Sequence, residues 1–262
     1  MKRLSVLVTS GGTKVEVDMV RSITNMSRGT FGSAIAKCFL EKGHIVDFLM
    51  AEGSRSPFKF EADATNKDAK DYFREIIEWH LFVSRHMDFF SSFSFRTFED
   101  YQVRMVEYLL KRRKYDIIIL ACAVSDYGIS NYVDGKIRSG NAMSIELTPY
   151  PKIISSVREM QSDTFLVGFK LLVKSEYNEL ISAASESLVK NKCDMIVAND
   201  LNDIRANDHK LFIVEPPEKT GNKITRYGKE ECFVYHKTLP QILVGHILDS
   251  YDKKHPESKI VE

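Results

Sequence analysis

The segment from residue 11 to residue 32 carries the side chains best suited to chemistry, and it follows a short apolar run. Two glycine clusters, at residues 11–12 and 29–32, enclose Arg21 and Asn25. A loop needs neither a guanidinium nor an amide for its structure, whereas both groups bind phosphates and carboxylates well. The segment is therefore a candidate site for an anionic ligand.

The second glycine cluster lies where a helix is expected to begin, at the Ser-Arg-Gly-Thr of residues 27–30. Free backbone N–H groups, hydroxyls and the positive end of the helix dipole make such a start an anion site. The alternative is an ordinary N-cap at Ser27 or Thr30. This loop alone supports the two interpretations equally.

A second candidate segment follows the most apolar run of the chain. Residues 121–127 read Ala-Cys-Ala-Val-Ser-Asp-Tyr, and the polar stretch behind them contains Lys136. Ligands of open parallel sheets bind at the carboxyl ends of strands, which places Asp126 and Lys136 well. A lysine about 4 Å from a phosphate contributes about 4 kcal/mol at an effective dielectric of about 20. The alternative for a lone lysine is an exposed loop position without a function.

A nicotinamide-binding fingerprint is the main rival interpretation of the first segment. It requires a GxGxxG turn after the first strand and an acidic residue at the end of the second strand. The third glycine is missing at that spacing, and Asp47 lies inside the second expected strand rather than at its end. Both departures count against an NAD(P)-dependent oxidoreductase.

Alternating apolar patterns predict an α/β protein, a Rossmann-like doubly wound and mostly parallel sheet flanked by helices, with a small C-terminal hairpin. The expected strands are residues 4–8, 44–50, 58–62, 116–123, 143–147, 164–169 and 194–198, and the hairpin pairs residues 211–214 with 223–225. The expected helices are residues 32–41, 67–82, 99–112, 151–160 and 175–191, with a terminal helix after Pro240. The aromatic-rich residues 79–101 are interpreted as a helical insertion that packs on itself or on another subunit, with stacking on a ligand as the alternative.

Composition describes an ordinary globular chain of 262 residues with 44% hydrophobic residues, 28% charged residues and a net charge of +1. Such a chain is not typical of proteins that bind nucleic acid. Its longest apolar run is too short for a membrane span, and its first apolar segment is too short for a signal peptide. Four scattered cysteines without CxxC spacing suit a reducing compartment. We expect a cytoplasmic protein with a single domain over residues 1–262, without nucleic-acid or membrane partners.

Taken in series, the segments resemble the phosphopantothenate-cysteine ligases, most of all the stand-alone bacterial form. The matching motifs are GGT at residues 11–13, Asp-x-Val-Arg at 18–21, Ile-x-Asn-x-Ser-x-Gly-x-x-Gly at 23–32, Ala-Val-Ala-Asp-Tyr at 123–127 and Lys-Ile-Lys-Ser at 136–139. Further matches are TPYPKII at residues 148–154, Gly-Phe at 168–169 and DMIVAND at 194–200. The sequence departs from the family at Ser125, Arg138 and Lys152, which replace Ala, Lys and Asp.

The resemblance implies a two-step ligation in coenzyme A biosynthesis that yields 4'-phosphopantothenoylcysteine. The carboxylate of 4'-phosphopantothenate attacks the α-phosphate of a nucleoside triphosphate, and the amine of L-cysteine then displaces the nucleotide from the acyl nucleotidylate. CTP is favoured over ATP, Mg²⁺ accompanies the triphosphate, and the family is homodimeric. Because Met1 almost abuts the first strand, the flavin-dependent decarboxylase domain of other relatives does not fit, and we expect no flavin.

The resemblance also assigns site residues. Asn25 would stabilise the acyl nucleotidylate, and Lys136, on a flap of residues 128–142 that reaches the partner's site, would neutralise phosphate charge. The residues expected to bind phosphopantothenate are Arg21, Asn25 and Ala123. The residues expected to bind the nucleotide are Gly11, Gly12, Ser27, Gly29, Cys122, Ala123, Asp126, Lys136, Pro151, Lys152, Ile153, Ile154, Phe169 and Lys190. Lys190 is included because the position of a nucleotide-binding family lysine falls on Asn191 here, between two lysines. No residue is expected to bind a metal directly.

A non-catalytic nucleotide-binding module of the same fold is the second alternative. Such a module would keep the glycine loops but would not need the groups that act on the reacting atoms. The presence of both Asn25 and Lys136 favours the enzyme over the module.

Overall fold

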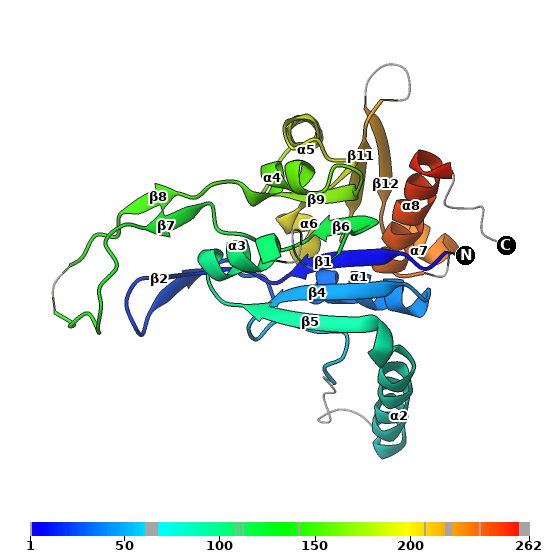
Figure 1. The fold of residues 1–262 in the computed structure, drawn as a ribbon, viewed down its shortest axis with the longest axis horizontal. Helices are drawn as coiled ribbons and strands as arrows, with labels where there is room; N and C mark the ends of the chain where they lie inside the picture. Colours follow the sequence, from blue (N-terminus) through cyan, green and yellow to red (C-terminus); the bar gives the residue numbers. More distant parts are fainter. Residues whose placement is uncertain are drawn as a thin grey trace.

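An eight-stranded sheet forms the centre of the computed structural model, which describes residues 2–60, 68–107, 109, 111, 113–140, 142–206, 208–217, 222–235 and 237–256 (Figure 1). The strand order is β12-β11-β10-β9-β6-β1-β4-β5. The strands are β1 Ser5–Ser10, β4 Ile45–Ala51, β5 Phe90–Phe95, β6 Ile117–Leu120, β9 Phe165–Leu172, β10 Met195–Asp200, β11 Leu211–Glu215 and β12 Lys223–Tyr227. From β5 to β10 all neighbours are parallel, and β11 and β12 form the expected antiparallel hairpin.

Helices cover both faces of the sheet, as a doubly wound fold requires. They are α1 Thr30–Glu41, α2 Ala69–His86, α3 Phe98–Glu107, α4 Ile153–Met160, α5 Tyr177–Lys190, α6 Leu201–Arg205, α7 Lys229–Tyr235 and α8 Leu239–Lys254, with a short 3-10 helix at Met87–Phe89. One apolar cluster joins the sheet to α1 and α8 through Phe39 and Ile247. The other joins it to α3, α4 and α5 through Met105, Val157 and Leu180. The predicted Rossmann-like architecture is confirmed.

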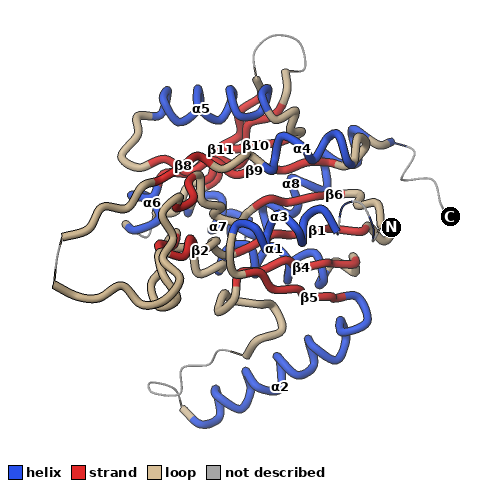
Figure 2. Tube along the Cα trace, turned by 60° about the vertical axis from the view of Figure 1, so that its left-hand side comes forward, coloured by secondary structure: helices blue, strands red, loops and turns tan. Residues whose placement is uncertain are grey.

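Part of the aromatic-rich stretch of residues 79–101 is a strand of this sheet, so the stretch is not helical throughout as expected. It contains the end of α2 and the edge strand β5, which pairs in parallel with β4. Phe95 is buried on the α3 face of the sheet, whereas Phe90 packs on the α1 face. Phenylalanines on both sides of β5 suit a strand with two covered faces. Helix α2 projects from the body (Figure 2).

The described part of the strand expected at residues 58–62 does not form a strand, because residues 57–59 form a turn. The remaining positions, 61 and 62, lie outside the described residues. Phe58 instead covers the sheet with its side chain, which stacks on Phe90 of β5 with ring centroids 4.3 Å apart. An apolar run that packs through its side chains alone was therefore mistaken for a strand.

Two short ribbons leave the main sheet at the carboxyl ends of its strands (Figure 1). The first pairs β2 Lys14–Glu16 with β3 Ser22–Thr24, and the second pairs β7 Tyr127–Ile129 with β8 Leu147–Pro149. The strand expected at residues 143–147 is thus displaced, because residues 143–146 are extended without regular ladder pairing. Neither β2 nor β3 was predicted, since three residues give too short a pattern.

Close packing of α1 on β1 depends on glycine. A Cβ atom added at Gly32 would lie 2.5 Å from Ser10 Oγ and 2.8 Å from Ser10 Cβ. Gly29 is similarly restricted, because its φ is +71° and its Cβ would lie 2.8 Å from Ser10 Oγ. The two glycines therefore let the first turn of α1 rest on the end of β1.

Gly32→Ala is expected to lower the free energy of unfolding by about 1–3 kcal/mol, because the added methyl group overpacks against Ser10. Gly245→Ala is the matched control, since Gly245 also lies in a helix, α8, and nothing stands within 4 Å of its added Cβ. There the same change should stabilise by roughly 0.5–1 kcal/mol. Urea unfolding followed by circular dichroism measures both, and equal effects would contradict the close contact.

Candidate active site at the carboxyl ends of β1 and β6

Strands β1 and β6 stay paired beyond their last regular residues. Gly12 and Ala123 form a parallel bridge, and the Ala123 N–H donates to the Gly11 carbonyl over 2.8 Å. The Ser125 N–H donates to Thr13 Oγ1 over 2.8 Å. From β1 the chain proceeds to β4 on one side and later to β6 on the other, so this is the switch point where open α/β sheets bind ligands.

Asn25 lies across this junction. Its Nδ2 donates to the Ala123 carbonyl over 2.9 Å, although the two residues are 98 positions apart. A Cβ atom at Gly12 would come within 2.9 Å of the Asn25 carbonyl, so glycine lets the loop lie flat here. A primary amide carries two N–H groups and this hydrogen bond uses one of them. Since Asn25 is exposed, its second N–H can serve a ligand.

The start of α1 faces the same junction, and its N-cap is Gly29. Within the described part of the chain no side chain caps the helix, which counts against the alternative of an ordinary N-cap at Ser27 or Thr30. The Ser27 N–H instead donates to the Asn25 carbonyl over 2.8 Å. Uncapped N–H groups at a helix start favour the anion-site interpretation.

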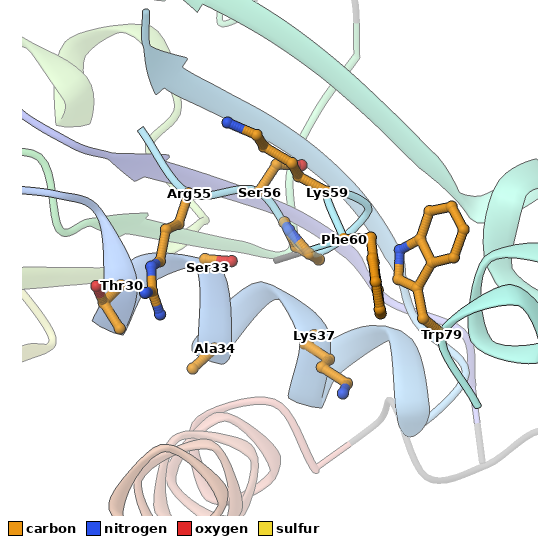
Figure 3. Close-up of a pocket in the computed structure, with 10 residues that line it drawn as sticks. Thr30, Ser33, Ala34, Lys37, Arg55, Ser56, Lys59, Phe60 and Trp79 are labelled. Atoms are coloured by element: carbon orange, nitrogen blue, oxygen red, sulfur yellow. The ribbon is translucent and has the colours of Figure 1, made fainter. Parts of the chain in front are cut away.

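A cavity of about 290 Å³ lies beside α1 (Figure 3). It is lined by Thr30, Ser33, Ala34, Lys37, Arg55, Ser56, Pro57, Lys59, Phe60 and Trp79. The amino groups of Lys37 and Lys59 point in different directions, so the cations do not converge on one ligand. The Arg55 side chain alone points toward Thr30 at the helix start, and the backbone N–H of Arg55 donates to the Arg28 carbonyl over 3.0 Å. Arg55 was missed from the sequence, because no motif marks the loop after β4.

Arg21 and Lys136 lie together at the ends of the ribbons, away from Asn25. Arg21 Nη1 donates to the Ile137 carbonyl over 3.2 Å, and Lys136 is exposed beside it. The three residues of β3 separate Arg21 from Asn25, so the two are four steps apart along the strand, about 13 Å at 3.3 Å per residue. One chain therefore presents an inner cluster around Asn25 and an outer cluster of Arg21 and Lys136.

The base of the β7–β8 ribbon holds a third group of the expected residues. Asp126 forms an ion pair with Lys152, and both side chains are exposed. The Tyr150 ring stacks on Phe98 with centroids 3.9 Å apart and fills the space where Gly128 has no side chain. Pro151 is exposed, while Ile153 and Ile154 pack on the core of the α4 face. The side chains of these two isoleucines are thus only partly exposed.

Phe169 faces the helix start from β9. Its ring meets that of Phe31 edge-on at 6.2 Å, and Phe31 also contacts His209 at 5.2 Å. The imidazole of His209 lies 3.3 Å from Asn199 Nδ2, and burial lowers the pKa of His209. Phe31, His209 and Asn199 were missed, although Asn199 belongs to the DMIVAND motif that marks this strand end.

Cys122 and Lys190 differ from the other expected residues. Burial raises the pKa of the Cys122 thiol well above its usual range, so its thiolate is not available as a nucleophile. Lys190 ends α5, which begins after the carboxyl end of β9 and returns to the amino end of β10. The lysine therefore lies at the amino ends of the parallel strands, whereas the candidate site lies at their carboxyl ends. Its assignment to the same ligand site was wrong.

Metal and membrane features can be judged for the described residues. There, no group of three or more His, Cys, Asp or Glu side chains is arranged to hold a metal ion. In the same part of the chain, every helix is too short or too polar to cross a membrane. Carboxylates thus do not form a dedicated metal centre among the residues described.

The fold and the junction define a Rossmann-like α/β protein with a candidate ligand site at its switch point. The family described as "DNA/pantothenate metabolism flavoprotein C-terminal domain" matches residues 1–73 and 100–233, and the chain belongs to this family.

Three relatives illustrate the similarity. A "Coenzyme A biosynthesis bifunctional protein CoaBC" of Thermococcus kodakarensis is 34% identical over 226 residues, covering 86% of this chain and 48% of that protein. "Phosphopantothenate--cysteine ligase 1" of Oryza sativa subsp. japonica is 28% identical over 254 residues, covering 86% and 75%. The solved structure of a Cab2 mutant in complex with phosphopantothenate-cysteine is 22% identical with a TM-score of 0.77, covering 98% and 89%. The chain thus spans about half the length of the bifunctional relative.

Proposed function

We propose that the protein is a phosphopantothenate-cysteine ligase. In the first step a carboxylate oxygen of 4'-phosphopantothenate bonds to the α-phosphorus of a nucleoside triphosphate, and pyrophosphate leaves. In the second step the amine of L-cysteine attacks the acyl carbon, the acyl–oxygen bond breaks, and a nucleoside monophosphate and a proton leave. The name of the rice relative supports this reaction, as does the product in the Cab2 complex.

One observation carries the proposal, namely the Asn25 amide held on the Ala123 carbonyl beside the uncapped start of α1. Activation of a carboxylate by a triphosphate brings two anionic substrates together, so the site needs donors for both. The helix start, with Arg55 beside it, supplies N–H groups and positive charge for phosphates. The second N–H of Asn25 serves the acyl oxygen, where negative charge develops.

The nucleotide is CTP in this proposal, with ATP as the alternative. The aromatic rings of Phe31, Phe169 and His209 lie beside the helix start. In this proposal they form one wall of the nucleotide site. Magnesium usually keeps several waters and is held by phosphate oxygens rather than by a protein cage. The donor set of the described residues, without a carboxylate cluster, fits an ion that arrives with the triphosphate.

A ligation assay with CTP and ATP side by side tests the function. We expect pyrophosphate release that requires phosphopantothenate, and amide formation that also requires cysteine. CMP as the nucleotide product would establish CTP, whereas AMP would establish ATP. Absence of ligation with both nucleotides would refute the ligase, and hydride transfer with NAD(P)H would favour the oxidoreductase instead.

A homodimer that shares its sites is part of the proposal. The ribbon ends carry exposed apolar side chains, with exposed fractions of 67% for Met19, 66% for Val20 and 52% for Met143. A second copy would cover these side chains and bring its outer cluster to the inner cluster of the first.

Co-expressing Asn25→Asp and Lys136→Ala chains tests this sharing. Each mixed dimer then has one site with both side chains intact, so about a quarter of the wild-type activity should return. The two variants purified separately and assayed without subunit exchange are the control. Activity of the mixed dimer no higher than that of its parents would show that each chain completes its own site.

A further inference from the structure

Asp18 is a buried carboxylate in the turn that joins β2 to β3. Its side chain is 0% exposed. Oδ1 accepts hydrogen bonds from the N–H groups of Val20 at 2.8 Å and Arg21 at 2.6 Å. Oδ2 accepts from Arg21 Nη1 at 2.6 Å and from the Ile137 N–H at 3.0 Å. One side chain therefore joins its own turn, the Arg21 guanidinium and the flap.

The flap backbone is fixed on this turn on both sides of Lys136. Before the lysine, the Met19 N–H donates to the Gly135 carbonyl over 3.1 Å. After the lysine, the Ile137 N–H is bound by Asp18 and the Ile137 carbonyl by Arg21 Nη1. The side chain of Lys136 itself is exposed between these anchors. The carboxylate thus determines where the backbone presents that lysine.

The charge of Asp18 suits this arrangement. Burial alone would raise the pKa of its carboxyl, but the three backbone N–H groups and the guanidinium lower that pKa to about 2. All four partners are donors, so the site requires an acceptor at both oxygens. An asparagine would turn one N–H toward another N–H and leave a buried donor unsatisfied.

We propose that Asp18 is a positioning residue that holds Arg21 and Lys136 in one unit. The two cations then meet the two anionic substrates at a fixed position relative to each other. This inference rests on the proposed function of Lys136. Asp18 touches no substrate and acts through its neighbours. Its loss should therefore have a smaller effect once Lys136 is absent, because only Arg21 is then left for it to position.

A double-mutant cycle on pyrophosphate release tests the proposal. Asp18→Asn should lower the turnover number about tenfold in the wild-type background and by a clearly smaller factor, which acts through Arg21 alone, in the Lys136→Ala background. Asp134→Asn is the matched control, because Asp134 lies exposed on the same flap, and it should change the rate less than twofold. Equal losses from Asp18→Asn in both backgrounds would overturn the proposal. If Asp18 had a merely structural role, the free-energy effects of Asp18→Asn and Lys136→Ala would simply add.

Amide hydrogen exchange provides a readout that does not depend on enzymatic activity. In the wild-type protein the Ile137 amide should exchange at least tenfold more slowly than that of Ser139, an exposed position of the same flap. In Asp18→Asn this protection should disappear, whereas Asp134→Asn should retain it. Rapid exchange at Ile137 in the wild type would overturn the anchor. Absence of pyrophosphate release in the wild type would instead refute the ligase and leave the exchange result intact.

Discussion

Asn25→Asp is expected to slow amide formation by about 10²–10³-fold while pyrophosphate release persists. Loss of one preorganised donor to a developing oxyanion typically costs this much. The new carboxylate also lacks the N–H that reaches the Ala123 carbonyl over 2.9 Å, so two acceptors face each other. The second step suffers most, because it places charge on the acyl oxygen next to residue 25.

Single-turnover measurements separate the two steps. Radiolabelled triphosphate reports pyrophosphate release and radiolabelled cysteine reports the amide, so an accumulating acyl nucleotidylate would be visible. Asn222→Asp is the control. Asn222 directly precedes β12 and lies at the amino ends of the parallel strands, away from the candidate site. If Asn25→Asp slowed both steps by the same factor, Asn25 would not act selectively on the intermediate.

Lys136→Ala is expected to slow pyrophosphate release by about 100-fold and to affect the second step less. A cation about 4 Å from a phosphate contributes up to about 4 kcal/mol at an effective dielectric of about 20, and solvent around this exposed lysine reduces that figure. Every 1.4 kcal/mol corresponds to a tenfold change in rate. Charge grows on the leaving pyrophosphate in the first step, which makes that step the sensitive one.

The measurement is initial-rate pyrophosphate release at saturating substrates over a range of ionic strength. Lys190→Ala is the matched control, since Lys190 is also exposed but ends α5 at the far edge of the sheet. It should leave the rate unchanged. A large loss from Lys190→Ala, or none from Lys136→Ala, would contradict the assignment of the phosphate-binding lysine.

Much of the fold could be predicted from local pattern, because most elements bury one face or two. Period-two and period-3.6 apolar patterns located β1, β4, α1 and α5 within a few residues. The predicted ends of strands were wrong where side-chain hydrogen bonds replace the backbone pairing between strands. The apolar run after Ile117 continues to Val124, yet β6 ends at Leu120, and the Cys122 N–H then donates to Thr9 Oγ1 over 3.3 Å.

The candidate site was predictable where motifs mark it and unpredictable where contacts are distant in sequence. Asn25 and Ala123 were both singled out, but no local pattern shows that they touch across 98 positions. Arg55 and His209 carry no motif and reach the site through packing alone. Lys190 had a usable signal, because a helix that follows a parallel strand must return to the amino edge before the next strand begins.

The strand order shows that the candidate site lies away from the sheet edge that the family match omits. The junction between β1 and β6 is central, whereas β5 is an outer strand that pairs with β4 alone in the main sheet. The family match stops at residue 73 and resumes at residue 100, so it omits β5 and most of α2. The edge formed by β5 is therefore where this chain departs from the family match, whereas β12 at the other edge lies within it. The central strands, whose ends carry the candidate site, form the common part of the fold.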